Sequence, residues 1–340
     1  MKIADSATWI IKRAGMNPGI IIKGYHRLRI ITCAGLIFFS MVGYSQFRVI
    51  GYVHPGKEGP DMTKIAFQKI THLNIAFVNP DSSGNLVVPG GFDTLIKTSH
   101  QFKVKALASI GGGSHNPYYA NLLNDTNRSA LVDKLVDLVV DYNLDGIDVD
   151  LENDAIDSNY EKLVVDLSRK LRPLNKLLTS AVATWNGDKI STEALKKYDF
   201  INVMSYDETG PWTPDKPGPH AAYAKAERDL TYWVATRKIP RKKINLGLPF
   251  YGYCFGTQYG ASMSYSEIIN TFPGAEARDE VVPETGGNIY YNGLPTIKRK
   301  TVLALKKAGG VMVWQLMQDD PGTNSLLSAI HDTVQSGRSK

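Results

Sequence analysis

Residues 144–153 read Leu-Asp-Gly-Ile-Asp-Val-Asp-Leu-Glu-Asn, a run in which apolar and acidic side chains alternate. The apolar members are Ile147, Val149 and Leu151, and the acidic members are Asp148, Asp150 and Glu152. In an extended strand, alternate side chains point to opposite faces, so the three carboxylates share one face at about 6.6 Å spacing. Desolvating unpaired charge is costly, so this row indicates a functional strand. A solvated strand face, a cation site and an acidic loop are the alternatives.

The acidic run resembles the signature of glycoside hydrolase family 18, the chitinase family, which reads Asp-x-x-Asp-x-Asp-x-Glu. Asp145 begins the run and Glu152 ends it. Three further motifs are similar to those of the family and stand in the family's order. They are Ser109-Ile110-Gly111-Gly112 for Ser-x-Gly-Gly, Met204-Ser205-Tyr206-Asp207 for Met-x-Tyr-Asp, and Trp314 at the end of an apolar strand.

Beyond residue 46, short β-rich runs alternate with helical stretches, which predicts a parallel sheet with helices outside. Eight such units predict a closed (β/α)8 TIM barrel, the fold that the resemblance also implies. The expected strands are Phe47–Val53, His72–Val78, Lys105–Ile110, Gly146–Glu152, Leu178–Ala183, Phe200–Ser205, Ile244–Pro249 and Gly310–Gln315. The expected helices include Asp61–Ile70, Asn127–Tyr142, Ser158–Leu174, Ala221–Lys238 and Thr296–Ala308. An open doubly wound sheet is disfavoured, because Gly111-Gly112-Gly113 lacks the spacing of a dinucleotide-binding loop.

The segment between the seventh and eighth strands differs from many family members, which carry a sizeable α+β insertion there. Residues 252–295 are rich in Gly, Tyr and Pro. We therefore expect an irregular insertion or a small hairpin, and a shallower binding groove than in members with the full insertion.

Length and composition favour one large domain, which we place at residues 46–335. The chain has 340 residues, of which 43% are hydrophobic. Its formal net charge of +6 arises mostly from residues 1–45, which carry six basic side chains and one acidic side chain. The remainder has 33 basic and 32 acidic residues, so no nucleic-acid partner is indicated.

Residues 1–45 predict a leader. The apolar run Ile30–Tyr44 follows a basic stretch and is too short for a comfortable membrane span, but it is typical of a signal-peptide core. Cleavage before Gln46 would give a protein that is secreted, periplasmic or at the cell surface. Because the part before Ile30 is long for a leader, a start at Met16 or a wrongly assigned start is an alternative. An uncleaved anchor is another.

Cysteine and histidine usage indicates neither disulfides nor metal chemistry. Only Cys254 remains after the leader, so no internal disulfide can form, and no role is assigned to it. No His/Cys cluster has the spacing of metal ligands, and the acid row alone offers few oxygen ligands. We expect no metal and no cofactor, and we expect a monomer. Histidines such as His100 and His220 are taken as surface or satisfied core residues.

The acid row predicts acid–base chemistry at the mouth of the barrel. Active sites of such barrels lie at the carboxyl ends of the strands, so Glu152 is nearest a ligand, with Asp150 and then Asp148 deeper. Neighbouring carboxylates raise one another's pKa and titrate as a set. Glu152 can therefore keep a proton near neutral pH and give it to a leaving oxygen.

The resemblance implies a retaining mechanism in which the substrate supplies its own nucleophile. The 2-acetamido oxygen of the sugar would close an oxazolinium ring on the anomeric carbon, helped by its proximity. Asp150 would accept the acetamide N–H, Asp148 would share its proton and charge, and Tyr206 would donate to the acetamide oxygen.

Several further residues are candidates for contact with a sugar or for shaping the site. Trp314 would form the apolar floor under the sugar, since pyranose C–H groups pack on aromatic faces. The other candidate sugar contacts are Met204, Asp207, Tyr52, Phe77, Trp185 and Trp212. Each of the aromatic residues taken alone also fits simple packing. Asp145, Ser109, Gly111 and Gly112 are expected to serve geometry, with the glycines allowing close approach of the backbone.

Three functions follow from this resemblance. The first is a secreted chitinase that cleaves β-1,4 bonds between N-acetylglucosamine units. The second is an endo-β-N-acetylglucosaminidase acting on the chitobiose core of N-glycans. The third is a non-catalytic lectin or inhibitor on the same barrel, which is disfavoured because Glu152, Asp150, Asp148 and Tyr206 are all present.

Overall fold

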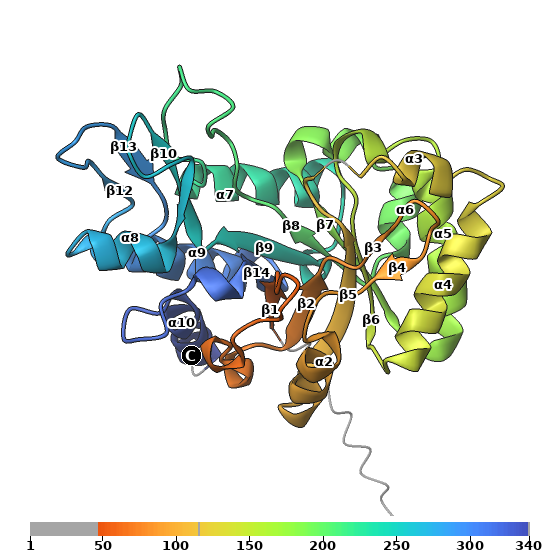
Figure 1. Ribbon diagram of the computed structural model, residues 1–340. Helices are drawn as coiled ribbons and strands as arrows, with labels where there is room; N and C mark the ends of the chain where they lie inside the picture. The colour runs from red at the N-terminus through yellow and green to blue at the C-terminus, as the bar shows by residue number, and fades with distance from the viewer. Residues whose placement is uncertain (1–46, 115, 339–340) are drawn as a thin grey trace, which may run out of the picture. The chain divides into compact units, whose positions relative to one another are not determined.

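The computed structural model describes residues 47–114 and 116–338 (Figure 1). The predicted leader, residues 1–45, and the predicted cleavage site before Gln46 lie outside the described residues. Within those two ranges, no helix is both long enough and apolar enough to cross a membrane.

Eight parallel strands close into a barrel, which confirms the predicted (β/α)8 architecture. Around the barrel their order is β1, β14, β9, β8, β7, β6, β5 and β2. Their bounds are β1 Arg48–Val53, β2 His72–Ala76, β5 Lys105–Gly111, β6 Gly146–Asp150, β7 Leu177–Val182, β8 Phe200–Val203, β9 Ile244–Pro249 and β14 Gly310–Trp314.

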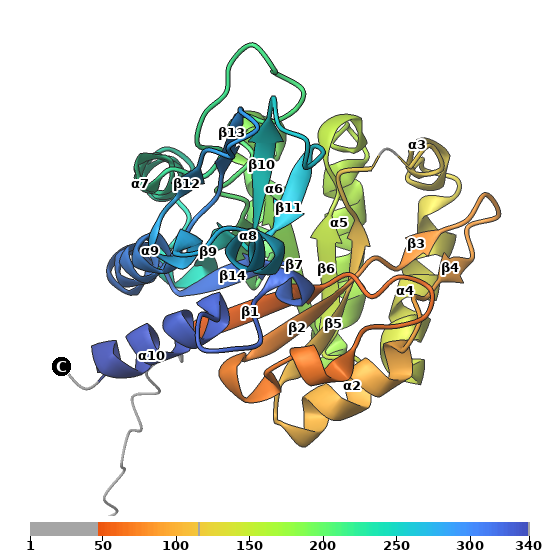
Figure 2. The ribbon, with the colours of Figure 1, turned by 60° about the vertical axis from the view of Figure 1, so that its left-hand side comes forward.

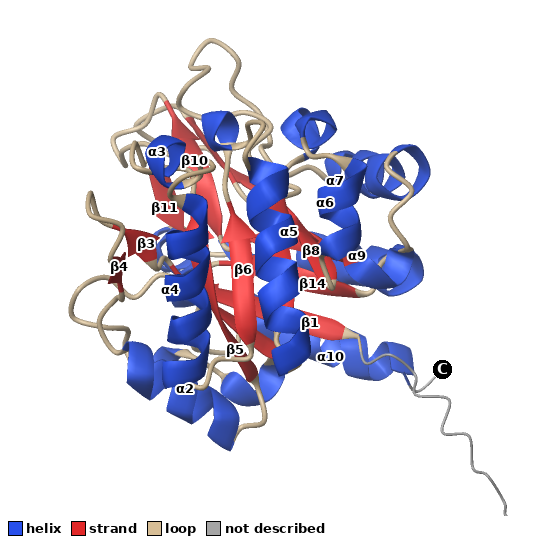
Figure 3. Cartoon of the chain, turned by 90° about the vertical axis from the view of Figure 1, so that its right-hand side faces the viewer, coloured by secondary structure: helices blue, strands red, loops and turns tan. Residues whose placement is uncertain are grey.

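Helices cover the outside of the barrel, and Figure 3 shows α4, α5 and α6 lying side by side over it. The helix bounds are α2 Phe92–Gln101, α3 Tyr119–Leu122, α4 Arg128–Asp141, α5 Tyr160–Leu171, α6 Thr192–Lys197, α7 Tyr223–Thr231, α8 Tyr265–Thr271, α9 Leu294–Lys307 and α10 Leu326–Arg338. Leu163, Val164 and Leu167 of α5 are fully buried, as expected for an amphipathic helix on a sheet.

The first crossover differs from the sequence prediction, which placed a helix over Asp61–Ile70. The structure has two 3₁₀ turns, Met62–Lys64 and Phe67–Lys69. The Asp61 side chain caps the first turn, and Ile65 then adopts an extended conformation with φ −101°. Breaking the helix there lets Ile65, Phe67 and Ile70 all reach the core. The helix α2 of the following unit was not among the predicted helices.

Several strands end earlier at the mouth than the sequence predicted, among them β2, which ends at Ala76 and not at Val78. β6 ends at Asp150 and β8 ends at Val203, although strands to Glu152 and Ser205 were expected. β6 pairs with β5 as far as Gly111↔Asp150 and with β7 only as far as Val149↔Ser180, so the ladder stops there. Glu152 therefore lies just beyond the strand, immediately before a 3₁₀ turn.

The interior of the barrel is unusually polar. Its apolar cluster includes Ile50, Ala76 and Met312. The polar or charged residues of the barrel strands that are at most 1% exposed include Asn74, Ser109, Asp148, Thr179, Asn202 and Asn245. Buried polar groups are stable only when hydrogen-bonded, so this interior requires a network.

The insertion between β9 and β14 is short, but it is more ordered than expected. It forms an antiparallel sheet in the order β11, β10, β13, β12, together with α8 (Figure 2). The strand bounds are β10 Tyr251–Phe255, β11 Ser262–Ser264, β12 Glu280–Val281 and β13 Asn288–Tyr290. Ser264 and Glu267 make a capping box that starts α8. A separate pair of strands, β3 Asn79–Pro80 and β4 Leu86–Val87, follows β2.

Candidate active site

Strand β6 carries the acid row into the barrel. Asp148 is completely buried and Asp150 is 3% exposed, whereas Glu152 beyond the strand end is partly exposed. The neighbours of Asp148 across the ladder are Ser109 on β5 and Thr179 on β7. The outward-facing residues Ile147 and Val149 belong to the main hydrophobic core instead.

Asp148 is surrounded by hydrogen-bond donors from four strands. Tyr52 Oη donates to Oδ2 at 2.6 Å and Ser109 Oγ donates to the same oxygen at 2.8 Å. Thr179 Oγ1 donates to Oδ1 at 2.5 Å, and Asn202 Nδ2 lies 3.3 Å from that oxygen. Burial raises the pKa of Asp148, but these hydroxyl donors act in the opposite direction because they stabilise the carboxylate.

Asp150 lacks comparable support. Its Oδ1 is buried and has no hydrogen-bond partner among the residues that the structure describes. Burial, the charge of Glu152 and the charge of Asp148 raise the pKa of Asp150 well above its usual value. This environment favours the protonated form of Asp150, and the residue presents an oxygen without a partner in the described ranges.

Glu152 has the protonation behaviour that a general acid requires. Burial and the nearby charge of Asp207 together raise its pKa to about 7. A carboxyl group with this pKa is partly protonated at neutral pH, which suits proton transfer to a leaving group.

A pocket of about 180 Å³ brings most of the predicted site residues together. It is lined by Phe77, Gly113, Asp150, Glu152, Met204, Tyr206, Asp207 and Trp314. These residues come from the carboxyl ends of β2, β5, β6, β8 and β14, or from the loops directly after them. The pocket therefore lies at the end of the barrel where such folds place their active sites.

Trp314 forms an aromatic wall of this pocket. Its ring is stacked on Phe77 with centroids 5.7 Å apart, and it is tilted against Tyr52 at 5.6 Å. The peptide bonds Ala76–Phe77 and Trp314–Gln315 are both cis. Trp314 remains partly exposed, so its ring is available to a ligand.

Tyr52 lies beneath the pocket and not in its lining. The sequence predicts Tyr52 as a candidate sugar contact. In the structure its side chain is 1% exposed, and its hydroxyl donates a hydrogen bond to Asp148. Because the ring is sandwiched between the acid row and Trp314, it supports the site from below.

Tyr206 keeps its proton in this environment. It is 6% exposed, and its hydroxyl lies 3.8 Å from Met312 Sδ. Burial and the charges of Asp207, Asp150 and Glu152 raise its pKa well above the usual value. A tyrosine that stays neutral can donate a hydrogen bond to a ligand oxygen.

The two glycines after β5 are required by the close approach of neighbouring groups. Gly111 has φ +103°, and a Cβ there would lie 2.2 Å from the Asp150 carbonyl oxygen. Gly112 has φ +94°, and a Cβ there would lie 2.5 Å from Phe77 Cε2. Neither position accepts a side chain. Asp145 lies at the other end of β6, where its carboxylate accepts the Ala106 N–H at 2.9 Å.

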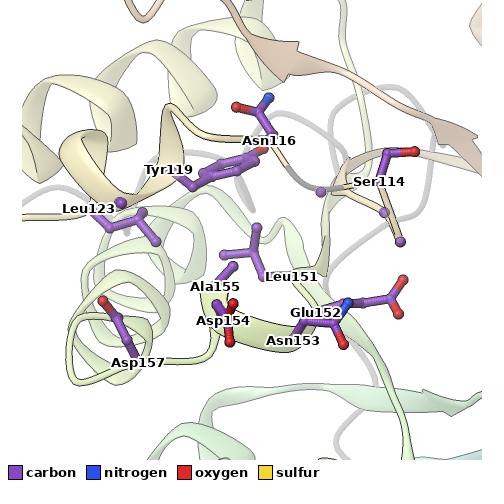
Figure 4. A pocket seen from close by; sticks show the side chains of 14 residues that line it. Ser114, Asn116, Tyr119, Leu123, Leu151, Glu152, Asn153, Asp154, Ala155 and Asp157 are labelled. Atoms are coloured by element: carbon purple, nitrogen blue, oxygen red, sulfur yellow. The ribbon is translucent and has the colours of Figure 1, made fainter.

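Glu152 also lines two larger pockets, one on each side. One has a volume of about 990 Å³ and includes Trp185 and Trp212, which are 60% and 57% exposed. The other, of about 340 Å³, lies between the loops after β5 and β6, next to Tyr119 (Figure 4). In Figure 4 the Glu152 carboxyl extends away from the side of the pocket formed by Leu123 and Asp157.

Several residues that contact the acidic side chains of the site were not predicted from the sequence. Thr179 and Asn202 were on predicted strands, but their contact with Asp148 depends on the register between strands. Tyr251 donates to Asp207, and His220 lies beside the same carboxylate. For Thr179 and Asn202, inward-facing parity on neighbouring strands was the available signal. His220 and Tyr251 had none, because their positions depend on the loop after β8 and on the insertion.

No group of three or more His, Cys, Asp or Glu residues in the described ranges could hold a metal ion.

Comparison with known proteins places this site in a family context. The family model for glycosyl hydrolases family 18 matches residues 48–319. The solved structure of the GH18 chitinase ChiB from the chitin utilization locus of Flavobacterium johnsoniae is 38% identical, with a TM-score of 0.80. That similarity covers 86% of this chain and 95% of that one. A GH18 chitinase of Cycas revoluta in complex with (GlcNAc)3 shares the fold at 24% identity, with a TM-score of 0.72 over 84% and 99% of the two chains.

The first relatives identified by sequence are matched over shorter stretches of this chain. A chitinase-like effector of Moniliophthora roreri is 28% identical over 235 residues, which are 59% of this chain and 58% of that protein. The first three curated relatives are matched over only 56 to 64% of their own lengths.

Proposed function

Because the chain belongs to glycosyl hydrolases family 18, we propose that it is a chitinase that hydrolyses β-1,4 bonds between N-acetylglucosamine units. The observation that carries the proposal is Glu152, partly exposed and with its pKa raised to about 7, at the end of a buried acid row and beside an aromatic wall. The similarity to the Flavobacterium johnsoniae chitinase supports it.

The proposed reaction uses the acetamide of the substrate as nucleophile. With a sugar packed on Trp314, Glu152 gives its proton to the glycosidic oxygen while the acetamide oxygen attacks the anomeric carbon. The C–O bond to the leaving sugar breaks, and an oxazolinium ion forms. Glu152, now a carboxylate, then takes a proton from the water that opens this ring, and the β-configuration is restored.

Asp150 and Tyr206 are proposed to orient the acetamide. The unused Oδ1 of Asp150 supports an acceptor role for the acetamide N–H. When the acetamide nitrogen becomes positively charged, Asp150 stabilises that charge best as a carboxylate, and the proposal gives Asp148 the role of taking up its proton or hydrogen bond. The neutral hydroxyl of Tyr206 supports donation to the acetamide oxygen.

The large pocket with Trp185 and Trp212 is proposed to bind further sugar units. Both rings are mostly exposed, and Trp212 is held edge-on against Tyr253 with centroids 5.2 Å apart. Exposed, oriented aromatic rings next to a catalytic acid suit stacking of pyranose units. Export is a further proposal, which rests on the basic stretch and apolar run before residue 46.

A product profile tests the proposed function. Purified protein is incubated with chitin oligomers and, in parallel, with an N-glycosylated protein, and the products are separated by mass. Release of short N-acetylglucosamine oligomers with β-configuration supports the proposal. Release of N-glycans with no cleavage of chitin oligomers would make the protein an endo-β-N-acetylglucosaminidase, and tight binding with no product would make it a lectin.

A further inference from the structure

His220 is a completely buried histidine that the proposed mechanism does not use. It lies on the loop between β8 and α7, and its ring is packed between Tyr251 at 5.0 Å and Tyr253 at 4.9 Å. Its backbone carbonyl accepts the Glu208 N–H at 3.0 Å, which ties the two ends of the loop together. The ring is therefore fixed beneath the mouth of the barrel.

The fixed ring contacts the Asp207 carboxylate. His220 Nδ1 lies 3.3 Å from Asp207 Oδ1 and 3.4 Å from the Asp207 backbone nitrogen, and the hydroxyl of Tyr251 donates to the same carboxylate oxygen. Asp207 itself has φ +58°, a left-handed conformation that is costly for a residue with a side chain. Such a conformation persists where surrounding contacts hold it.

We propose that His220, together with Tyr251, is a positioning residue that holds the Asp207 carboxylate beside Glu152. This inference rests on the proposed function, because it concerns the residue assigned there as the acid. Asp207 and Glu152 line the same two pockets, so the placement of the first determines the charge that the second meets.

The surrounding charges indicate that His220 is neutral. Burial lowers its pKa, and the positive charge of Lys300 lowers it further, while Asp207 acts in the opposite direction. Lys300, on α9, is buried and donates to the Ala221 carbonyl oxygen and to Asn292 Oδ1, both at 2.6 Å. Beyond it on α7, Lys225 and Asp229 form an ion pair at 3.1 Å. The other titratable groups that face the ring are the hydroxyls of Tyr251 and Tyr253, which burial keeps neutral.

Both polar contacts of Nδ1 are with Asp207, one with its backbone N–H and one with its carboxylate. Among residues 47–114 and 116–338, the buried Nε2 has no hydrogen-bond partner. Within the described residues, the hydrogen-bonding contacts of the ring are therefore with Asp207.

Loss of this support has a predictable effect. The Asp207 side chain is already 39% exposed, so a released carboxylate would turn into solvent, where its charge is screened. Because that charge raises the pKa of Glu152, releasing it would lower this pKa. The acid would then lose its proton at a lower pH.

The test is the pH profile of kcat/KM on an N-acetylglucosamine oligomer for the parent and for H220F, which keeps an aromatic ring and removes Nδ1. Direct charge neighbours shift a pKa by about one to three units, so an indirect change should move the basic limb about half a unit or more to lower pH. Y251F should move it in the same direction, and it serves as the second arm where H220F does not fold. D207N should give the largest shift.

The control is the same substitution in a D207N background. If His220 and Tyr251 act through Asp207, then H220F and Y251F should add no shift there. A limb that stays in place or moves to higher pH in the folded variants would overturn the proposal, as would a shift that persists without Asp207.

The inference can fail separately from the proposed function. If the parent does not cleave the oligomer, carboxyl-labelled glutamate is followed by NMR against pH, with E152Q used to assign the Glu152 signal. A lower titration midpoint of Glu152 in H220F supports the positioning role without any turnover, and an unchanged midpoint contradicts it.

Discussion

Asp148 and Asp150 are two residues apart on one strand, face the same interior and are equally buried, but they are supported very differently. Asp148 has hydroxyl donors from Tyr52, Ser109 and Thr179. Asp150 has an oxygen with no partner in the part of the chain that the structure describes, and it faces carboxyls on both sides. Donors, more than depth, therefore decide which carboxyl can carry charge.

This difference assigns separate tasks to the two ends of the row. At the lower end, the hydrogen bonds of Asp148 are satisfied, and they stabilise the barrel. The upper end is left incomplete, and incomplete buried polar groups are costly unless a ligand completes them. The following predictions test that division.

The largest effect is expected at the outer end of the row. Glu152→Gln removes the transferable proton but keeps the shape, so kcat on chitin oligomers should fall by about 10²–10⁴-fold, the usual contribution of general acid catalysis. Oligosaccharide affinity, measured by calorimetry, should change little. Turnover close to the parent's would show that the acid lies elsewhere.

The next effect concerns Asp150. Asp150→Asn mimics the protonated carboxyl in shape, but it cannot become a carboxylate when charge develops on the acetamide. We expect kcat to fall by about a hundredfold or more, in the range found when one stabilising group of a transition state is removed. The parent should also cleave poorly a substrate that lacks the acetamide, and rapid cleavage of such a substrate would argue against substrate assistance.

The same substitution should have a pH-dependent effect on stability. The folded-state pKa of Asp150 is raised above its unfolded value, so the folded protein binds more protons and loses stability as pH rises through that interval. Asp150→Asn lacks this penalty. Urea unfolding between about pH 4 and pH 8 should show its stability relative to the parent increasing with pH. A constant difference would mean that Asp150 is charged in the folded protein.

Asp148→Asn should show the opposite pattern, with stability as the main readout. An asparagine keeps the volume but turns an NH2 group toward hydroxyls that now donate. We expect a loss of about 1–3 kcal/mol in the free energy of unfolding, as for buried polar groups left unpaired. If Asp148→Asn and Asp150→Asn destabilise equally, the contrast between the two acids is wrong.

The smallest effect is expected from Tyr52→Phe, which removes one donor to Asp148 and leaves the ring under Trp314. A single buried hydrogen bond contributes about 1 kcal/mol, more when one partner is charged. Thermal unfolding should detect this loss, while KM should change little because Tyr52 does not line the pocket. A large rise in KM would indicate that Tyr52 contacts the sugar after all.

Much of this arrangement was predictable from sequence because it depends on local periodicity. The alternation in β6 placed the three acids on one face, and eight apolar runs predicted the barrel. Local periodicity does not predict which residues of neighbouring strands lie opposite one another. Thr179 and Asn202 contact Asp148 because of the stagger between β6, β7 and β8. The pattern within a single strand gives no information about this stagger.

The other differences also have a nonlocal origin. Residues 61–70 have the composition of a helix, but burial of Ile65, Phe67 and Ile70 outweighs that preference and leaves two short turns. The insertion looked irregular because its strands are only two to five residues long, too short to show a period. The sequence does not indicate that His220 contacts Asp207, because the path of the loop between β8 and α7 brings the two residues together.

The alternation in β6 also limits how this gene can change length. Removing or adding one codon between Gly146 and Asp150 would turn every later side chain to the opposite face. Carboxylates would then lie against the apolar helices, and Val149 would replace an acid in the polar interior. The loop after Phe255, with Gly256 and Gly260 open to solvent, has no such constraint. Natural variation in length should therefore be absent from the first segment and tolerated in the second.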